Sequence, residues 1–126
     1  MSDEEILNYT SHAIVIFSTN NPIATVVIRP CGVLVYLEID SKTEKTWSKI
    51  VNGNEITVKN APVYTNVKNL PDSLRNIAVT PEVATFLKNN PHLYAGHVYS
   101  ADTSNDGAVY NGMGQMIGTR RLIQHK

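Results

Sequence analysis

The stretch KTWSKIVNGNEITVK, residues 45–59, decides how this sequence should fold. Two segments rich in β-branched residues, 45–51 and 55–59, flank Asn52-Gly53-Asn54. Asn-Gly between two such segments is among the strongest local signals for a β-hairpin, because both residues tolerate the positive φ angles of a tight turn. The sequence therefore predicts a pair of antiparallel strands near the middle of the chain.

The residues before this hairpin predict three further strands. Runs at 12–18, 23–29 and 32–40 are rich in β-branched residues and are bounded by Asn-Asn-Pro, Pro-Cys-Gly and Asp-Ser-Lys, which are turn-forming sequences. In the third run, apolar residues alternate with more polar ones, which is typical of a strand with one buried face. Together with the hairpin, these runs predict a meander of five consecutive antiparallel strands.

Two helices are expected. Ser2 and the acids that follow it favour a short helix that ends near Tyr9. Thr80-Pro81-Glu82 provides an N-cap, a proline suited to the first turn and an acid near the positive end of the helix dipole, so the main helix should run from there to about Lys88. Asn89-Asn90-Pro91 then ends it. Its apolar face, which includes Phe86, should pack on the sheet.

The remaining segments complete a single α+β domain, 1–126. Residues 60–79 predict a loop with a short strand near Val63 and a turn at 72–75. In the tail, 93–100 and 116–124 alternate like strands, a polar loop separates them, and 111–114 form a second tight turn. The expected fold is thus an antiparallel β-sheet meander with one main helix packed on it.

Composition excludes several classes of protein. The chain has 126 residues, enough for a core without disulfides, and its one cysteine, Cys31, cannot form an internal bridge. A reducing, cytoplasmic location is the simpler expectation. The acidic residues 1–5 are not typical of a signal peptide, so none is expected, and the longest apolar runs are too short to cross a membrane. Eleven basic and eleven acidic residues leave no net charge, which argues against duplex nucleic acid as a partner.

Motifs for catalysis or metal binding are weak. Asp102-x-Ser104-x-Asp106-Gly107 matches the start of a calcium loop, but Met113 stands at its twelfth position, so a plain polar loop is favoured. His92 and His97 would face opposite sides of one strand and could not share an ion. No phosphate-binding glycine motif and no nucleophile motif is present. We expect no catalytic residues, no metal and no cofactor, and a binding protein more readily than an enzyme.

Arginines and aromatic residues are the candidates for ligand contacts. Arg29 ends one predicted strand, and Arg120 and Arg121 lie inside another. Arginine binds phosphate in a planar, bidentate manner, although a strand arginine is more often solvated or in a salt bridge. Tyr99 is one of several strand tyrosines that could stack on a base, or that are simply half-buried in the sheet.

The overall pattern resembles the phage Thoeris anti-defence proteins that sequester cyclic ADP-ribose signals. The resemblance is carried by the strand-rich N-terminal half with its Asn-Asn-Pro turn, the Ile-Arg-Pro strand end, the Thr-Pro-Glu helix with Phe86, and the late Gly-Thr-Arg-Arg strand. It implies a non-enzymatic homo-oligomer, built from dimers, that holds a nucleotide-like ligand in the host cytoplasm without cleaving it. Some relatives also bind cyclic oligonucleotides.

The resemblance also implies roles for individual residues. Phe86 would contact an adenine, with Asn89 or Asn90 beside it. Arg29 and Arg120 or Arg121 would hold phosphates.

Two other functions fit the same composition. A small hydrolase or ring nuclease could use His97 as a base, oriented by Asp102. A structural module could bind a protein partner by adding a strand to an exposed sheet edge.

Overall fold

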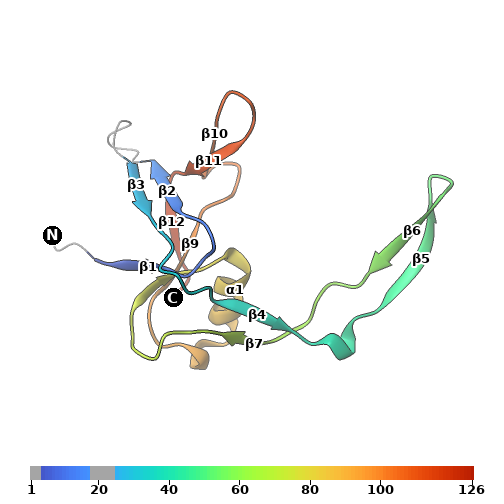
Figure 1. Ribbon diagram of the computed structural model, residues 1–126, viewed down its shortest axis with the longest axis horizontal. Helices are drawn as coiled ribbons and strands as arrows, with labels where there is room; N and C mark the ends of the chain where they lie inside the picture. Colours follow the sequence, from blue (N-terminus) through green and yellow to red (C-terminus); the bar gives the residue numbers. More distant parts are fainter. Residues whose placement is uncertain (1–3, 18–24) are drawn as a thin grey trace. The chain divides into compact units, whose positions relative to one another are not determined.

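The computed structural model describes residues 4–17 and 25–126 (Figure 1). They form two compact units. The first, here called the packed unit, comprises the described residues up to Val35 together with residues 69–126. The second, here called the ribbon, comprises residues 36–68.

The packed unit contains a four-stranded mixed sheet. Its strands, in spatial order, are β1 (Ile6–Asn8), β8 (Asn76–Ala78), β9 (Val98–Ala101) and β12 (Leu122–Gln124). The first three strands run parallel, and β12 is antiparallel to β9. The only α-helix in the described part of the chain, α1 (Pro81–Asn89), connects β8 to β9, as expected for a crossover between parallel strands.

A second four-stranded sheet belongs to the same unit. Its strands, in spatial order, are β10 (Ala108–Tyr110), β11 (Met116–Thr119), β2 (Ile14–Phe17) and β3 (Thr25–Ile28). The outer pairs are antiparallel, whereas β11 and β2 are parallel and meet at Thr119 and Ile16. A 3-10 turn, η2 (Pro91–Leu93), follows α1.

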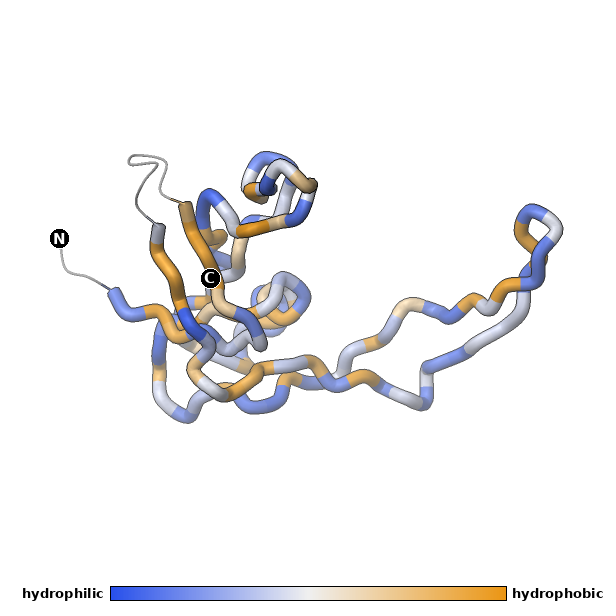
Figure 2. Tube along the Cα trace, turned by 45° about the horizontal axis from the view of Figure 1, so that its top comes forward, coloured by the Kyte–Doolittle hydropathy of each residue, from blue (hydrophilic) through white to orange (hydrophobic). Residues whose placement is uncertain are grey.

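The ribbon consists of two successive pairs of antiparallel strands. β4 (Tyr36–Ile39) pairs with β7 (Tyr64–Lys68), and β5 (Thr46–Val51) pairs with β6 (Asn54–Lys59). A 3-10 turn, η1 (Ser41–Thr43), separates β4 from β5. Figure 2 shows apolar and polar residues alternating along this unit.

The hairpin predicted from residues 45–59 is confirmed. Asn52 and Gly53 form its turn with φ angles of 52° and 79°. Two successive positive φ angles match the twist of the flanking strands, which is why Asn-Gly is favoured there.

The hydrophobic core lies in the packed unit. The buried apolar side chains of this unit are Tyr9, Ile14, Val35, Ile77, Ala78, Val79, Val83, Ala84, Leu87, Tyr94, Val98 and Ala108. In the ribbon, whose residues are all described, only Val67 is buried. Burial of α1 against β9 and its neighbours therefore supplies much of the stability of the packed unit.

The main helix is confirmed, and its ends show how it is held. Thr80 stands at the N-cap, although its side chain makes no capping hydrogen bond. At the other end, the backbone and side-chain amides of Asn90 both donate to the carbonyl of Phe86, at 3.0 and 2.9 Å. Val83 and Leu87 are buried and Phe86 is half-buried, as the predicted apolar face requires.

The N-terminal helix predicted to end near Tyr9 is wrong. Residues 1–3 lie outside the described residues, and Ile6–Asn8 form β1, which pairs in parallel with β8. Isolated short helices are marginal in water, whereas a strand here gains backbone hydrogen bonds from β8.

In the part of the chain that the structure describes, the strands lie in four small sheets and not in one five-stranded meander. Of the predicted runs, 12–18 and 23–29 do form the antiparallel pair β2 and β3, with Ser18, Ile23 and Ala24 outside the described residues. The run 32–40 narrows to β4, which pairs with β7 instead of β3. The predicted strand at 116–124 is divided between the two sheets of the packed unit as β11 and β12. The broad class, α+β and mostly strand, is as predicted.

Candidate functional site

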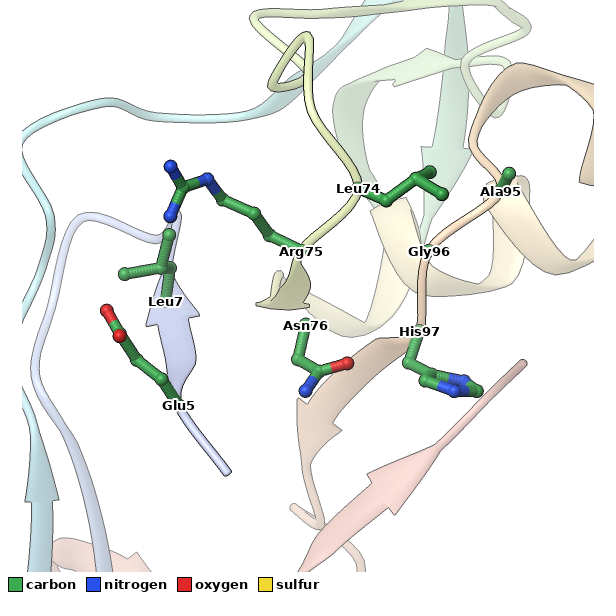
Figure 3. Close-up of a pocket in the computed structure, with 8 residues that line it drawn as sticks. All are labelled: Glu5, Leu7, Leu74, Arg75, Asn76, Ala95, Gly96 and His97. Atoms are coloured by element: carbon green, nitrogen blue, oxygen red, sulfur yellow. The ribbon is translucent and has the colours of Figure 1, made fainter. Parts of the chain in front are cut away.

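A pocket of about 380 Å³ opens where the three parallel strands β1, β8 and β9 begin (Figure 3). We call it the amino-end pocket. Its lining residues are Glu5, Leu7, Leu74, Arg75, Asn76, Ala95, Gly96 and His97. The lining thus combines apolar side chains with a guanidinium, an amide, an imidazole and a carboxylate, a mixture typical of small-molecule sites.

The backbone of Arg75 is fixed by a buried tyrosine. The hydroxyl of Tyr94 donates to the carbonyl of Arg75 at 2.7 Å and accepts from its amide at 2.9 Å. Tyr94 itself is buried. The start of β8 is therefore held at both of the backbone polar groups of Arg75.

Gly96 permits this arrangement. A Cβ at this position would lie 2.5 Å from the carbonyl oxygen of Arg75 and 2.6 Å from the ring of Tyr94. Any side chain would push these groups apart, so glycine is required by close approach of the backbone.

The Arg75 side chain extends over the pocket. Its Nε donates to the hydroxyl of Ser73 at 3.1 Å. Figure 3 shows the guanidinium reaching past Leu7, with the Glu5 carboxylate on the same side of β1. In residues 4–17 and 25–126, no ion pair involves Arg75. Its charge is therefore open to a ligand, while Glu5 would oppose an anion placed directly beside it.

His97 borders the pocket, but its imidazole is within hydrogen-bond distance of the Lys126 backbone. Its Nδ1 lies 3.1 Å from the carbonyl oxygen of Lys126 and 3.3 Å from Nε2 of Gln124. In Figure 3 its ring points away from Arg75. His97 thus forms a wall of the pocket and does not converge with Arg75 on one point.

A second pocket, of about 340 Å³, has a more apolar lining. Its residues come from β2, β11 and the end of β9: His12, Ala13, Ile14, Val15, Ala101, Thr103, Met116, Ile117, Gly118 and Thr119. None of the described residues that line it is an arginine or lysine that could hold a phosphate.

The six ligand-binding residues predicted from the sequence do not gather at one site. Arg29 follows β3 and is exposed, and Arg120 is exposed between β11 and β12. Tyr99 is half-buried in β9, while Phe86 and Asn90 lie at the end of α1, where the Asn90 side chain is engaged by the Phe86 carbonyl. Neither of the two pockets is lined by any of these residues or by Arg121.

Arg121 is engaged by a carboxylate. Its Nη1 donates to Oδ2 of Asp102 at 2.7 Å and lies 3.7 Å from Oδ2 of Asp106. Asp102 is buried, and its Oδ1 accepts from the amide and hydroxyl of Ser104 at 3.1 and 2.7 Å. The bonds from Ser104, followed by Arg121, hold the pKa of Asp102 below its usual value.

These contacts change the interpretation of the polar loop. Asp102 is oriented toward Arg121, so it does not serve as the orienting partner of His97. Gly107 packs directly against the carboxylate, since a Cβ there would lie 2.2 Å from the Asp102 Cγ. Among the described residues, no group of three or more potential metal ligands is gathered in one place. The loop is best understood as a structural turn closed by an ion pair.

Of the residues that line the amino-end pocket, sequence reasoning singled out only His97, as a possible base, and it missed Arg75 and Gly96. Arg75 lies in a segment predicted as a turn, where an arginine carries no positional signal. Gly96 did offer one: an isolated glycine inside a predicted strand indicates close approach of another backbone segment.

Comparison with known proteins identifies no relative of this chain. No family model, no curated protein and no solved structure matches this chain. In the part of the chain that the structure describes, no helix has the length and apolar character needed to span a membrane.

Proposed function

We propose that this protein binds a small phosphate-bearing nucleotide signal of the cyclic ADP-ribose type and holds it without cleaving it. This is the role of the phage anti-defence proteins that the sequence resembles. The observation that supports the proposal best is the Arg75 guanidinium, without an ion-pair partner in the described residues, on a backbone fixed by Tyr94 at a pocket of about 380 Å³.

The chemistry of the pocket fits such a ligand. A cyclic dinucleotide-like molecule carries phosphates and flat rings, which a guanidinium, an amide and apolar walls can hold together. Arg75 would bind a phosphate, Asn76 would bond a polar edge, and Leu7 and Leu74 would contact a ring. A backbone that is fixed before binding lowers the entropic cost of association.

Binding is favoured over catalysis by the contacts of the two candidate catalytic residues. Asp102 bonds Arg121, and the Nδ1 of His97 faces the Lys126 carbonyl. The Lys126 carbonyl can orient the imidazole as a carboxylate would, but the ring of His97 points away from Arg75 and therefore away from the proposed phosphate position (Figure 3). The hydrolase or ring nuclease remains the alternative that the experiment must distinguish.

Calorimetry with cyclic ADP-ribose and with a cyclic dinucleotide tests the proposal. We expect Arg75→Ala to weaken binding by roughly 10-fold to 100-fold, because a hydrogen bond to a charged group contributes about 1.5–3 kcal/mol. Arg29→Ala is the matched control and should leave affinity unchanged. Heating the complex and analysing the released ligand should recover it intact.

Three results would contradict the proposal. A hydrolysed product would make the protein an enzyme. If binding is lost in Arg120→Ala and kept in Arg75→Ala, the ligand binds at the arginines predicted from the sequence and not in the amino-end pocket. If neither ligand binds, the remaining hypothesis is a structural module that binds a protein partner. Arg121→Ala is less informative than Arg120→Ala, because it strips the buried Asp102 carboxylate of its ion pair.

A further inference from the structure

Among residues 4–17 and 25–126, the strands of the outer half of the ribbon, β5 and β6, pair only with each other. β5 and β6 form a two-stranded sheet, so each strand keeps one free edge. Trp47, Val51 and Ile56 remain 47%, 38% and 42% exposed. An isolated two-stranded hairpin is only marginally stable in water, and three or more strands are needed for a self-supporting sheet.

The hydrogen bonds within the hairpin define what the free edge of β6 presents. The amide of Asn60 donates to the carbonyl of Lys45 at 3.2 Å, so even-numbered residues of this strand direct their backbone groups toward β5. Alternate residues of a strand direct these groups to opposite sides. The free edge therefore carries the backbone N–H and C=O groups of Glu55, Thr57 and Lys59.

We propose that β6 pairs with β6 of a second copy of this chain, antiparallel, around a two-fold axis at Thr57. Thr57 then faces Thr57 of the second copy, and Glu55 faces Lys59 in both directions. The outward backbone groups of these residues satisfy one another, as an antiparallel ladder requires. This pairing uses no residue of the amino-end pocket and does not depend on the proposed function.

Charge complementarity selects this register. Opposite charges that face each other across strands stabilise a sheet, and like charges destabilise it. In the two neighbouring registers, Glu55 or Lys59 would instead face Thr57, and the ion pairs would be lost. Lys59 also lies 3.0 Å from Glu44 of its own chain, an exposed contact that contributes little by itself.

The apolar side chains agree with the same register. Within the hairpin, Trp47 faces Val58 and Lys49 faces Ile56, which places Trp47, Ile56 and Val58 on one face. In the dimer, Ile56 of each copy faces Val58 of the other on that face. The result is a four-stranded sheet with a continuous apolar strip, which replaces two marginal hairpins.

The free edge of β5 lacks these properties. A two-fold axis at Ser48 would set Thr46 against Ile50 and Trp47 against Lys49, with no pair of opposite charges. β6 is therefore the edge that fits a second copy.

Proline substitutions test which edge pairs. The Thr57 N–H points away from β5, so Thr57→Pro should block the outer edge and leave the hairpin ladder in place. Ser48→Pro is the matched control, because Ser48 is the cross-strand neighbour of Thr57 and its N–H points to the free edge of β5. Sedimentation equilibrium of the full chain should show a concentration-dependent dimer that is lost in Thr57→Pro and kept in Ser48→Pro.

Charge reversal tests the register without proline. Glu55→Lys and Lys59→Glu should each weaken self-association roughly tenfold, because both ion pairs become like-charge contacts. Mixed together, the two variants should form a heterodimer, since each Lys then faces a Glu. This readout still decides the question if circular dichroism shows that Thr57→Pro disrupts the ribbon.

The overturning results are specific. A chain that is monomeric at all concentrations, a dimer that survives Thr57→Pro with its ribbon folded, or one that is lost in Ser48→Pro would refute pairing through β6. Variants that do not associate when mixed would refute the register.

Discussion

The packed unit and the ribbon are built from similar strand-forming residues, yet they are stabilised differently. The packed unit buries apolar residues from both of its sheets and from α1, whereas the ribbon buries only Val67. Two pairs of β-strands define the ribbon, but a core is what makes a unit stable by itself. The difference indicates that the packed unit carries the stability of the protein and the ribbon presents a surface.

The largest expected effect is a loss of unfolding free energy caused by a substitution in the core of the packed unit, which a substitution in the ribbon should not cause. Leu87 is fully buried, so Leu87→Ala should lower the free energy of unfolding by roughly 2–5 kcal/mol. Ile56→Ala in the ribbon is the counterpart and should change it by less than about 0.5 kcal/mol. Urea unfolding measures both, at concentrations where the protein is monomeric. Equal losses would show that the ribbon belongs to the same cooperative core.

A buried polar residue provides the second comparison. Asn8 is fully buried; its Nδ2 donates to the carbonyls of His12 and Ile28, both at 2.8 Å, and its Oδ1 accepts from Thr10. Asn8→Asp replaces a donor with an acceptor that faces two carbonyls, so we expect a loss of roughly 1–3 kcal/mol.

The matched variant in the ribbon is Asn54→Asp. Asn54 is exposed, and its side chain makes one long contact of 3.4 Å to the carbonyl of Asn52. The Asn54→Asp variant should therefore unfold with a free energy within about 0.5 kcal/mol of that of the unchanged protein. If Asn8→Asp is as mild as this control, the hydrogen bonds of Asn8 do not hold β1 in place.

The smallest effect is a pH dependence of the packed unit. Burial, followed by the nearby charge of Lys88, holds the pKa of His125 below its ordinary value of 6.5. The fold favours the neutral imidazole. The contribution of His125 to the free energy of unfolding is therefore complete above about pH 6.5, and it is lost as the pH falls toward the lower pKa of the folded state.

Melting temperatures between pH 7 and pH 5 measure this effect. We expect a modest fall on acidification that is reduced in His125→Gln, whose amide can keep a bond to the Ser100 hydroxyl, now 2.7 Å from the imidazole Nε2. A fall of the same size in His125→Gln would assign the acid sensitivity to another group.

Local signals in the sequence predicted the local elements of the fold. The Asn52-Gly53 turn and the Thr80-Pro81 helix start depend on neighbouring residues, so they were found. The division of 116–124 into β11 and β12 depends on which distant strand each segment meets, and alternation alone does not reveal that. β1 is three residues long and is defined by its pairing with β8.

The candidate site was harder to predict for the same reason. Arg121 was selected for its charge, but the structure pairs it with Asp102, nineteen residues earlier in the chain. Arg75 had no distinguishing neighbour, and its position depends on Tyr94, which is also nineteen residues away. Residue type identified which groups could bind an anion, whereas long-range packing decides which of them are open to do so.

The side-chain amide of Asn69 donates to the carbonyl of Leu34 at 3.0 Å, so the chain leaves the packed unit and re-enters it at neighbouring points. The ribbon is therefore an insertion in the topological sense, and the segment between these points can lengthen, shorten or change its sequence without rethreading either sheet. Asn69, which adopts a φ of 71°, closes the loop at its base. For a protein engineer, positions 35 and 69 mark where one module can be exchanged for another.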